Sequence, residues 1–233
     1  MAAPLTEAAI EQVRDLISTG QLSSGERLPP EAELAELLGT SRNTVREAVR
    51  ALVTARVLDV RRGDGTYVTS LRPELLLAGI GAAADLLQDG FTLELLEVRR
   101  ILEPAATAMA ATRISDQTLD ELAGCLHRMS AAETHDELVK HDEEFHRLVI
   151  AAAGNETLAS MLAGVSSRTT RGRAWRGVVE RGATARTISE HSNILEALRN
   201  RDPAVAEAAA LFHVATTEAW FRSVLATAST DSD

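Results

Sequence analysis

The segment Ser41–Val53, SRNTVREAVRALV, constrains the fold of this chain more than any other stretch. Its apolar residues recur at the spacing of one helix face, which predicts an amphipathic helix: Val45, Ala48, Val49 and Leu52. Ser41 can cap this helix by accepting a hydrogen bond from a backbone N–H two or three residues on. Periodicity alone fits a solvated amphipathic helix equally well, so the neighbouring segments must decide what the helix does.

Those neighbours predict a winged helix-turn-helix. Pro30–Leu38 has the pattern of a short helix, and Gly39–Thr40 can form the tight turn that joins a helix-turn-helix pair. After the second helix, the β-branched runs Val57–Val60 and Thr66–Thr69 flank a glycine-containing turn, which indicates a β-hairpin.

In such a motif, the start of the second helix contacts base edges in the major groove, and flanking cations contact phosphates. The polar residues of this helix and of the wing tip are therefore the candidate DNA-binding residues: Ser41, Arg42, Asn43, Thr44, Arg46, Arg50, Arg62 and Gly63. The net charge of −10 does not exclude DNA binding, because residues 40–63 contain six arginines and two acids, a local charge of +4. Binding requires a basic face rather than a basic protein.

The stretch Leu28–Val68, with its SRNTVREA core and GDGTYV wing, resembles the DNA-binding domain of the GntR family of bacterial transcription regulators. The resemblance implies that Arg42 and Arg46 contact bases or phosphates and that Gly63 lies at the minor groove.

Three residues depart from the family pattern. Ala32 replaces an arginine that contacts DNA in some members, so we expect that contact to be absent. Arg56 replaces the glycine that usually ends the second helix, so we expect a strained turn there. Asp64 places a negative charge at the wing tip, where it should repel phosphate.

The chain after Pro73 has helical patterns throughout and no strand pattern. We expect a first helix at 6–19, capped by Thr6, and further helices at 74–88, 92–112, 116–132, 135–153, 156–176, 183–200 and 203–226. The predicted fold is mainly α: a winged helix-turn-helix domain at 1–70, an antiparallel bundle of six or seven helices at 71–228, and a disordered tail at 229–233. No apolar run is long enough to span a membrane, no signal peptide is recognisable, and Cys125 is the single cysteine. We therefore expect a cytoplasmic protein without membrane contact.

A metal site is predicted inside the bundle. Asp142 and His146 lie four residues apart and so share a helix face, although such a pair alone is more typical of a solvated surface. His191 and His213 lie 11 residues before and after Asp202, the centre of a helical hairpin, which places them at equal height. One carboxylate and three imidazoles suit a divalent transition metal; zinc is favoured, and nickel, manganese or iron are alternatives.

The same region resembles the FCD ligand-binding domain of the FadR subfamily, through LLEVRRILEPAATAMAA, DEEFH, EHSNILEAL and a final FH. The resemblance, which spans roughly Leu95 to His213, implies that an aspartate and three histidines hold the metal, and these fall on the four residues just named. It also implies a small carboxylate effector. Arg99 could bind the effector carboxylate, or it could form a salt bridge to Glu103 within its own helix.

These features together predict a transcription regulator rather than an enzyme. We expect a homodimer that represses transcription from a palindromic operator in double-stranded DNA and is released by the effector. Two alternatives remain open: a pure metal sensor, in which the ion is itself the signal, and a metal-dependent hydrolase, because such a site can activate water.

Overall fold

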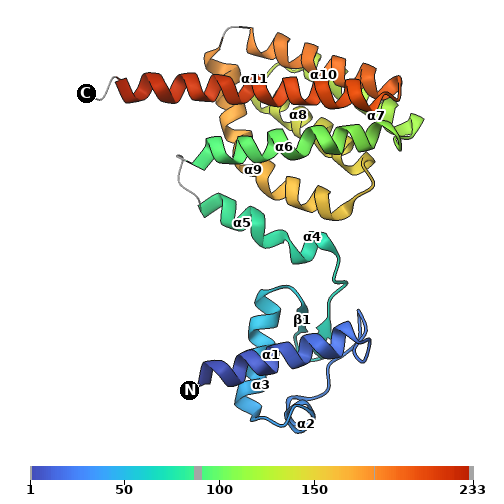
Figure 1. Ribbon diagram of the computed structural model, residues 1–233, viewed down its shortest axis with the longest axis vertical. Helices are drawn as coiled ribbons and strands as arrows, with labels where there is room; N and C mark the ends of the chain where they lie inside the picture. Colours follow the sequence, from blue (N-terminus) through green and yellow to red (C-terminus); the bar gives the residue numbers. More distant parts are fainter. Residues whose placement is uncertain (1, 87–90, 181, 231–233) are drawn as a thin grey trace. The chain divides into compact units, whose positions relative to one another are not determined.

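The computed structural model describes residues 2–86, 91–180 and 182–230. It divides the chain into two compact units, residues 1–79 and 80–233 (Figure 1). The sequence predicted the domain boundary at 70–71. The structure instead assigns the segment after the wing, residues 71–79, to the first unit. The expected helix at 74–88 is two helices, α4 (Pro73–Leu76) and α5 (Ala78–Leu86). The break falls at Leu77, which ends α4 with φ −96° and ψ 0°, and positions 87–90 lie outside the described residues.

The first unit is the winged helix-turn-helix that the sequence predicts. Its elements are α1 (Ala2–Ser18), α2 (Glu31–Leu37), α3 (Arg42–Thr54), β1 (Leu58–Arg61), β2 (Gly65–Val68) and α4. The two strands are antiparallel, with Leu58 opposite Val68 and Arg61 opposite Gly65. The core lies between α1, α3 and the hairpin and includes Val13, Val45, Ala48, Leu52 and Leu58.

Two details at the ends of these helices bear on the predictions. Ser41 caps α3 by accepting a hydrogen bond from the backbone N–H of Thr44 at 3.1 Å, as expected. The predicted cap of α1 at Thr6 is wrong, because the helix already begins at Ala2. Alanine has the highest helix propensity and Pro4 is compatible with a first turn, so the helix extends beyond Thr6 toward the N-terminus.

The second unit is an all-α bundle. Its remaining helices are α6 (Thr92–Ala111), α7 (Asp116–Ala131), α8 (His135–Ala152), α9 (Glu156–Val179), α10 (Ala183–Arg199) and α11 (Pro203–Thr230). α6 packs along α11, α7 along α8, and α10 along α11 (Figure 1). The largest core cluster includes Leu122, Phe145, Ile194 and Leu198.

Residues 229 and 230, which we expected in a disordered tail, belong to α11, and residues 231–233 lie outside the described part of the chain. Among the described helices, none combines the length and the apolar character that a membrane-spanning segment requires.

Candidate metal centre and DNA-binding face

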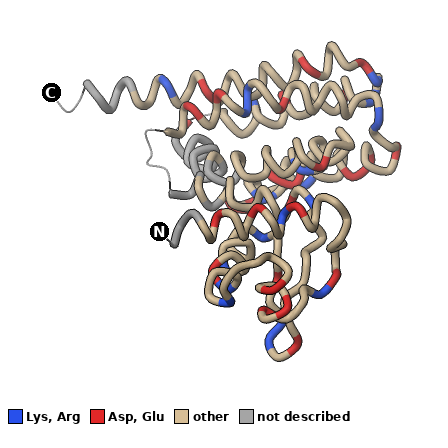
Figure 2. Tube along the Cα trace, turned by 60° about the horizontal axis from the view of Figure 1, so that its bottom comes forward, with Lys and Arg blue, Asp and Glu red and all other residues tan. Residues whose placement is uncertain are grey.

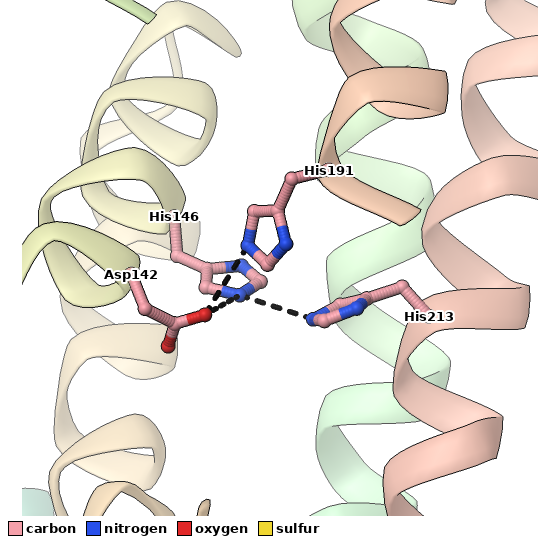
Figure 3. Close-up of side chains that lie close together, drawn as sticks. All are labelled: Asp142, His146, His191 and His213. Atoms are coloured by element: carbon pink, nitrogen blue, oxygen red, sulfur yellow. Dashed lines mark hydrogen bonds and ion pairs between the residues drawn. The ribbon is translucent and has the colours of Figure 1, made fainter. Parts of the chain in front are cut away.

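The structure brings the four predicted ligands together inside the second unit (Figure 3). Asp142 and His146 lie one turn apart on α8, whose start is fixed by a capping box between Thr134 and Glu137. His191 comes from α10 and His213 from α11.

The turn between α10 and α11 sets the height of the two histidines. Arg201 adopts a left-handed conformation with φ 52°, and the Asp202 side chain accepts hydrogen bonds from the backbone N–H groups of Ala204 and Val205. The helices then run back along each other, so that the rings of His191 and His213 lie 4.5 Å apart between centroids. The equal spacing of His191 and His213 from Asp202 in the sequence therefore predicted correctly that the two rings lie side by side.

The ligand atoms of the four residues converge. One from each residue can be chosen so that all four lie within 4.8 Å of one another. The His191 Nε2 atom is 3.3 Å from Asp142 Oδ1, and the Nε2 atoms of His146 and His213 are 3.2 Å apart. All four residues are buried, and His191 has no exposed surface.

The hydrogen bonds behind the rings orient the free nitrogen of two histidines inward. The His191 Nδ1–H donates to the backbone carbonyl of Thr187 at 2.7 Å, and the His213 Nδ1–H donates to the Glu190 carboxylate at 2.8 Å. In a neutral imidazole the other nitrogen, Nε2, then carries a lone pair. Burial lowers the pKa of His213, and the nearby His191 acts in the same direction, so this ring is neutral at neutral pH.

This arrangement fits a cation. The Nε2 atom of His191 is buried and makes no hydrogen bond to any residue that the structure describes. Such an orphaned acceptor is rare in a protein interior, and it is explained when a metal takes its lone pair. Three imidazole nitrogens and one carboxylate oxygen are the donor set of a divalent transition metal, with thiolate ligands absent.

Sequence reasoning missed the residues that support the ligands. Glu190 is buried and accepts hydrogen bonds from His213 and from the hydroxyl of Thr216. Glu103 lies 3.6 Å from His146 Nδ1. The adjacency of Glu190 to His191 in the sequence was the only signal, and it does not reveal that Glu190 points toward α11.

Arg99 is buried on α6 and engaged in its own helix. Its Nε donates to Glu103 Oε1 at 2.6 Å, its Nη2 donates to Glu103 Oε2 at 3.2 Å, and its Nη1 donates to the hydroxyl of Thr169 at 2.9 Å. The salt bridge that the sequence offered as the alternative is therefore present. A role for Arg99 in effector binding stays a prediction.

The candidate DNA-binding residues lie on α3 and on the wing. Arg42, Asn43, Arg46 and Arg50 are exposed, and Thr44 is half-buried beneath the Ser41 cap. Two of these arginines form ion pairs with glutamates, and the sequence analysis predicted neither pair. Arg46 forms a two-pronged ion pair with Glu31 at the start of α2, at 2.7 Å, and Arg50 pairs with Glu47 at 2.9 Å.

The wing tip is a tight turn. Gly63 has φ 78°, and Arg62 and Gly63 are both exposed. The negative charge that we expected to repel phosphate has a partner, because the hydroxyl of Tyr67 donates to Asp64 at 2.8 Å. The guanidinium of Arg61 lies 3.9 Å from the centroid of the Tyr67 ring, a cation–π contact on the same tyrosine.

Each of the two units matches a known protein family or domain. Residues 5–68 match the family described as bacterial regulatory proteins, gntR family, and residues 94–216 match the FCD domain. The HTH-type transcriptional regulator LutR of Bacillus subtilis (strain 168) is 31% identical over 210 residues, which cover 87% of this chain and 94% of LutR. The galactonate operon transcriptional repressor of Escherichia coli (strain K12) is 30% identical over 203 residues, 84% of this chain and 87% of the repressor.

The fold also matches a solved structure. Streptococcus agalactiae GntR aligns with a TM-score of 0.65 and 28% sequence identity, over 91% of this chain and 98% of that one.

Proposed function

We infer that this chain, which belongs to the GntR family of bacterial regulatory proteins and carries an FCD domain, is a repressor whose affinity for its operator is lowered by a small carboxylate. The family and the relatives are DNA-binding transcription regulators. The metal-dependent hydrolase that the sequence left open is therefore excluded.

The observation that carries the proposal is the buried centre of Asp142, His146, His191 and His213 in a domain joined to a DNA-binding unit. These residues would hold a divalent ion, with zinc first and nickel, manganese or iron as alternatives. When bound, the ion would supply positive charge and open coordination positions that suit a carboxylate oxygen. The chain itself contributes the orientation of the rings, through Thr187 and Glu190.

A sugar acid or hydroxy acid is the proposed class of effector, and the name of one relative supports the sugar acid. That relative is named as the repressor of a galactonate operon, and galactonate is a sugar acid. Because Arg99 is 1% exposed, the effector would have to enter the bundle to reach it. A small ligand is thus favoured over a large one.

The operator is proposed to be palindromic and the protein to act as a homodimer. A single recognition helix spans only a few base pairs of the major groove, and two-fold pairing of helix-turn-helix domains supplies the second half-site. Arg42 and Asn43, at the exposed start of α3, are the residues proposed to contact base edges, while Arg62 and Gly63 contact the backbone or the minor groove.

The test is a panel of sugar acids, hydroxy acids and dicarboxylates screened by thermal shift, followed by operator titration with each compound that binds. A coupling of about 1–3 kcal/mol would lower operator affinity roughly 5- to 150-fold at saturation, and operator DNA must weaken effector binding by the same factor. The proposal fails if a compound binds equally well to the metal-stripped protein, or if saturation leaves operator affinity unchanged.

A pure metal sensor is the second candidate. Arg99, the residue proposed to bind an effector carboxylate, is buried and donates to Glu103 and Thr169, which favours the ion itself as the signal. Operator binding that changes with metal concentration in the absence of any organic ligand would support the sensor. Operator binding that is indifferent to metal but responds to a carboxylate would contradict it.

A further inference from the structure

Glu31, the first residue of α2, places a negative charge beside the arginines of α3. Its Oε2 accepts a hydrogen bond from Arg46 Nη2 at 2.7 Å, and Arg46 Nε lies 3.2 Å from both carboxylate oxygens. These hydrogen bonds lower the pKa of Glu31, and the charges of Arg50 and Arg42 act in the same direction. The carboxylate is therefore ionised at neutral pH and close to all three arginines.

A carboxylate at this position opposes DNA binding in general. Phosphate contacts supply most of the affinity for DNA of any sequence, and a fixed negative charge on the basic face weakens them. Figure 2 shows acidic residues (red) interspersed with basic residues (blue) in the first unit, so this face is not free of negative charge. Glu31 therefore has a cost for DNA affinity that some other contribution must offset.

Fold stability does not supply that contribution. The side chain of Glu31 is 43% exposed and that of Arg46 is 49% exposed, so water screens the charges of the pair. Exposed ion pairs of this kind stabilise a protein little. The geometry of the pair points instead to a role in how Arg46 is presented.

The ion pair occupies one edge of the Arg46 guanidinium. A guanidinium carries five N–H groups in a rigid plane, and Glu31 accepts from Nε and Nη2. The edge formed by Nη1 and the second N–H of Nη2 has no acceptor among the residues that the structure describes. Two parallel N–H groups on such an edge match O6 and N7 of guanine in the major groove.

Arg46 also lies where a base can be reached. It comes one helical turn after Arg42, the first residue of α3, and so shares a helix face with it. In a helix-turn-helix this part of the second helix approaches the base edges. A guanidinium held on one edge loses less conformational freedom when its other edge binds a base.

We propose that Glu31 determines the sequence specificity of operator binding by positioning Arg46, whose Nη1–Nη2 edge reads one guanine in each half-site. Glu31 acts through Arg46 and touches no base itself. Its charge also weakens binding to other sequences, because a duplex without guanine at that position gains no base contact that offsets the repulsion of its phosphates. This inference rests on the proposed function for the orientation of α3 toward DNA.

The test begins with the identification of a probe. Duplexes with a randomised core are selected on the full-length wild-type protein, and every base pair of the resulting consensus is then substituted singly. Affinities are measured at one salt concentration for wild type and for Arg46→Ala, which identifies the position that Arg46 reads. We expect guanine there, and a loss of roughly 5- to 150-fold in wild-type affinity when it is replaced.

Glu31→Ala is then compared with Glu33→Ala, which removes the same charge from an exposed position of the same helix. We expect Glu31→Ala to reduce the penalty at the Arg46 position to about threefold or less, and to leave the penalties at other positions unchanged. Its affinity for a duplex of scrambled sequence should rise about 2- to 10-fold. Glu33→Ala should keep the wild-type penalty at every position.

Melting curves check that each variant folds, and Glu31→Gln, with the same side-chain length and no charge, replaces Glu31→Ala if that variant does not. Full discrimination by the Glu31 variant would overturn the proposal. Unchanged operator affinity would then indicate a purely structural pair, and raised affinity a carboxylate that competes with DNA for Arg46. An equal loss of discrimination in Glu33→Ala, or an Arg46→Ala profile identical to that of wild type, would also overturn it. A wild-type protein that enriches no duplex would instead contradict the proposed function.

Discussion

Removing one ligand of the metal centre should abolish the metal dependence of stability. His191→Ala is the best choice, because His191 is fully buried and its Nδ1–H is fixed by Thr187, so its Nε2 has no described role apart from the centre. A ligand that binds only the folded state stabilises it by mass action.

The expected magnitude follows from that relation. An ion present at 1,000 times its Kd adds about 4.1 kcal/mol to the free energy of unfolding. Each kcal/mol shifts the Tm of a domain of about 150–250 residues by about 2–4 °C, so loading should raise the Tm by roughly 8–16 °C. Each further tenfold increase in ion concentration adds about 1.4 kcal/mol, or roughly 3–5 °C.

The assay combines metal content by elemental analysis with melting curves over a zinc series, for wild type, His191→Ala and His127→Ala. His127 is an exposed histidine of α7 and serves as the matched control. His191→Ala also leaves a cavity that lowers stability by itself. The decisive quantity is therefore the dependence of Tm on zinc, which should vanish for His191→Ala and persist for His127→Ala. Equal slopes, or a wild type that binds no first-row metal, would refute the site.

Three further changes test other parts of the molecule. Arg46→Ala should lower operator affinity roughly 5- to 150-fold, since a lost contact is worth about 1–3 kcal/mol. The Tm should barely change, because the ion pair with Glu31 is exposed. Equal affinities in a titration at one salt concentration would contradict this. Arg56→Gly should raise the free energy of unfolding, measured in urea, by about 0.5–1 kcal/mol. The φ of Arg56 is 60°, a left-handed conformation that glycine adopts without strain. A decrease in the free energy of unfolding would contradict this. Glu190→Gln should weaken metal affinity about 10- to 100-fold, since Glu190 orients His213. Unchanged metal affinity in a competition titration would show that Glu190 does not support the centre in this way.

The features that local pattern determines were predictable from the sequence. The cap at Ser41 and the paired strands of the wing depend on residues close together in the chain, and both are present. The positive φ of Arg56 is the conformation that the missing glycine would have taken. The adjacency of His191 and His213 was predictable because an antiparallel hairpin converts equal sequence distances into equal heights.

Other features depend on contacts that no local pattern contains. The ion pair of Arg46 with Glu31 joins α3 to the preceding helix and depends on how the two helices pack. Glu190 precedes His191 by one residue, so it lies about 100° around α10, and only the position of α11 makes it a partner of His213. The break between α4 and α5 falls at Leu77 and follows no stop signal in the sequence, because the nearby Gly79 and Gly81 lie within α5.

The sequence left two roles open for Arg99: binding an effector carboxylate, and a salt bridge to Glu103 on the same helix face. Spacing brought Arg99 and Glu103 together, but it could not say whether that pair uses every donor of the guanidinium. In the structure three of its five N–H groups donate to Glu103 and Thr169 within the described part of the chain. Among the described residues, the second N–H of each Nη atom has no acceptor. An effector carboxylate would therefore bind beside the salt bridge rather than replace Glu103, and the bridge would hold the guanidinium in place for it.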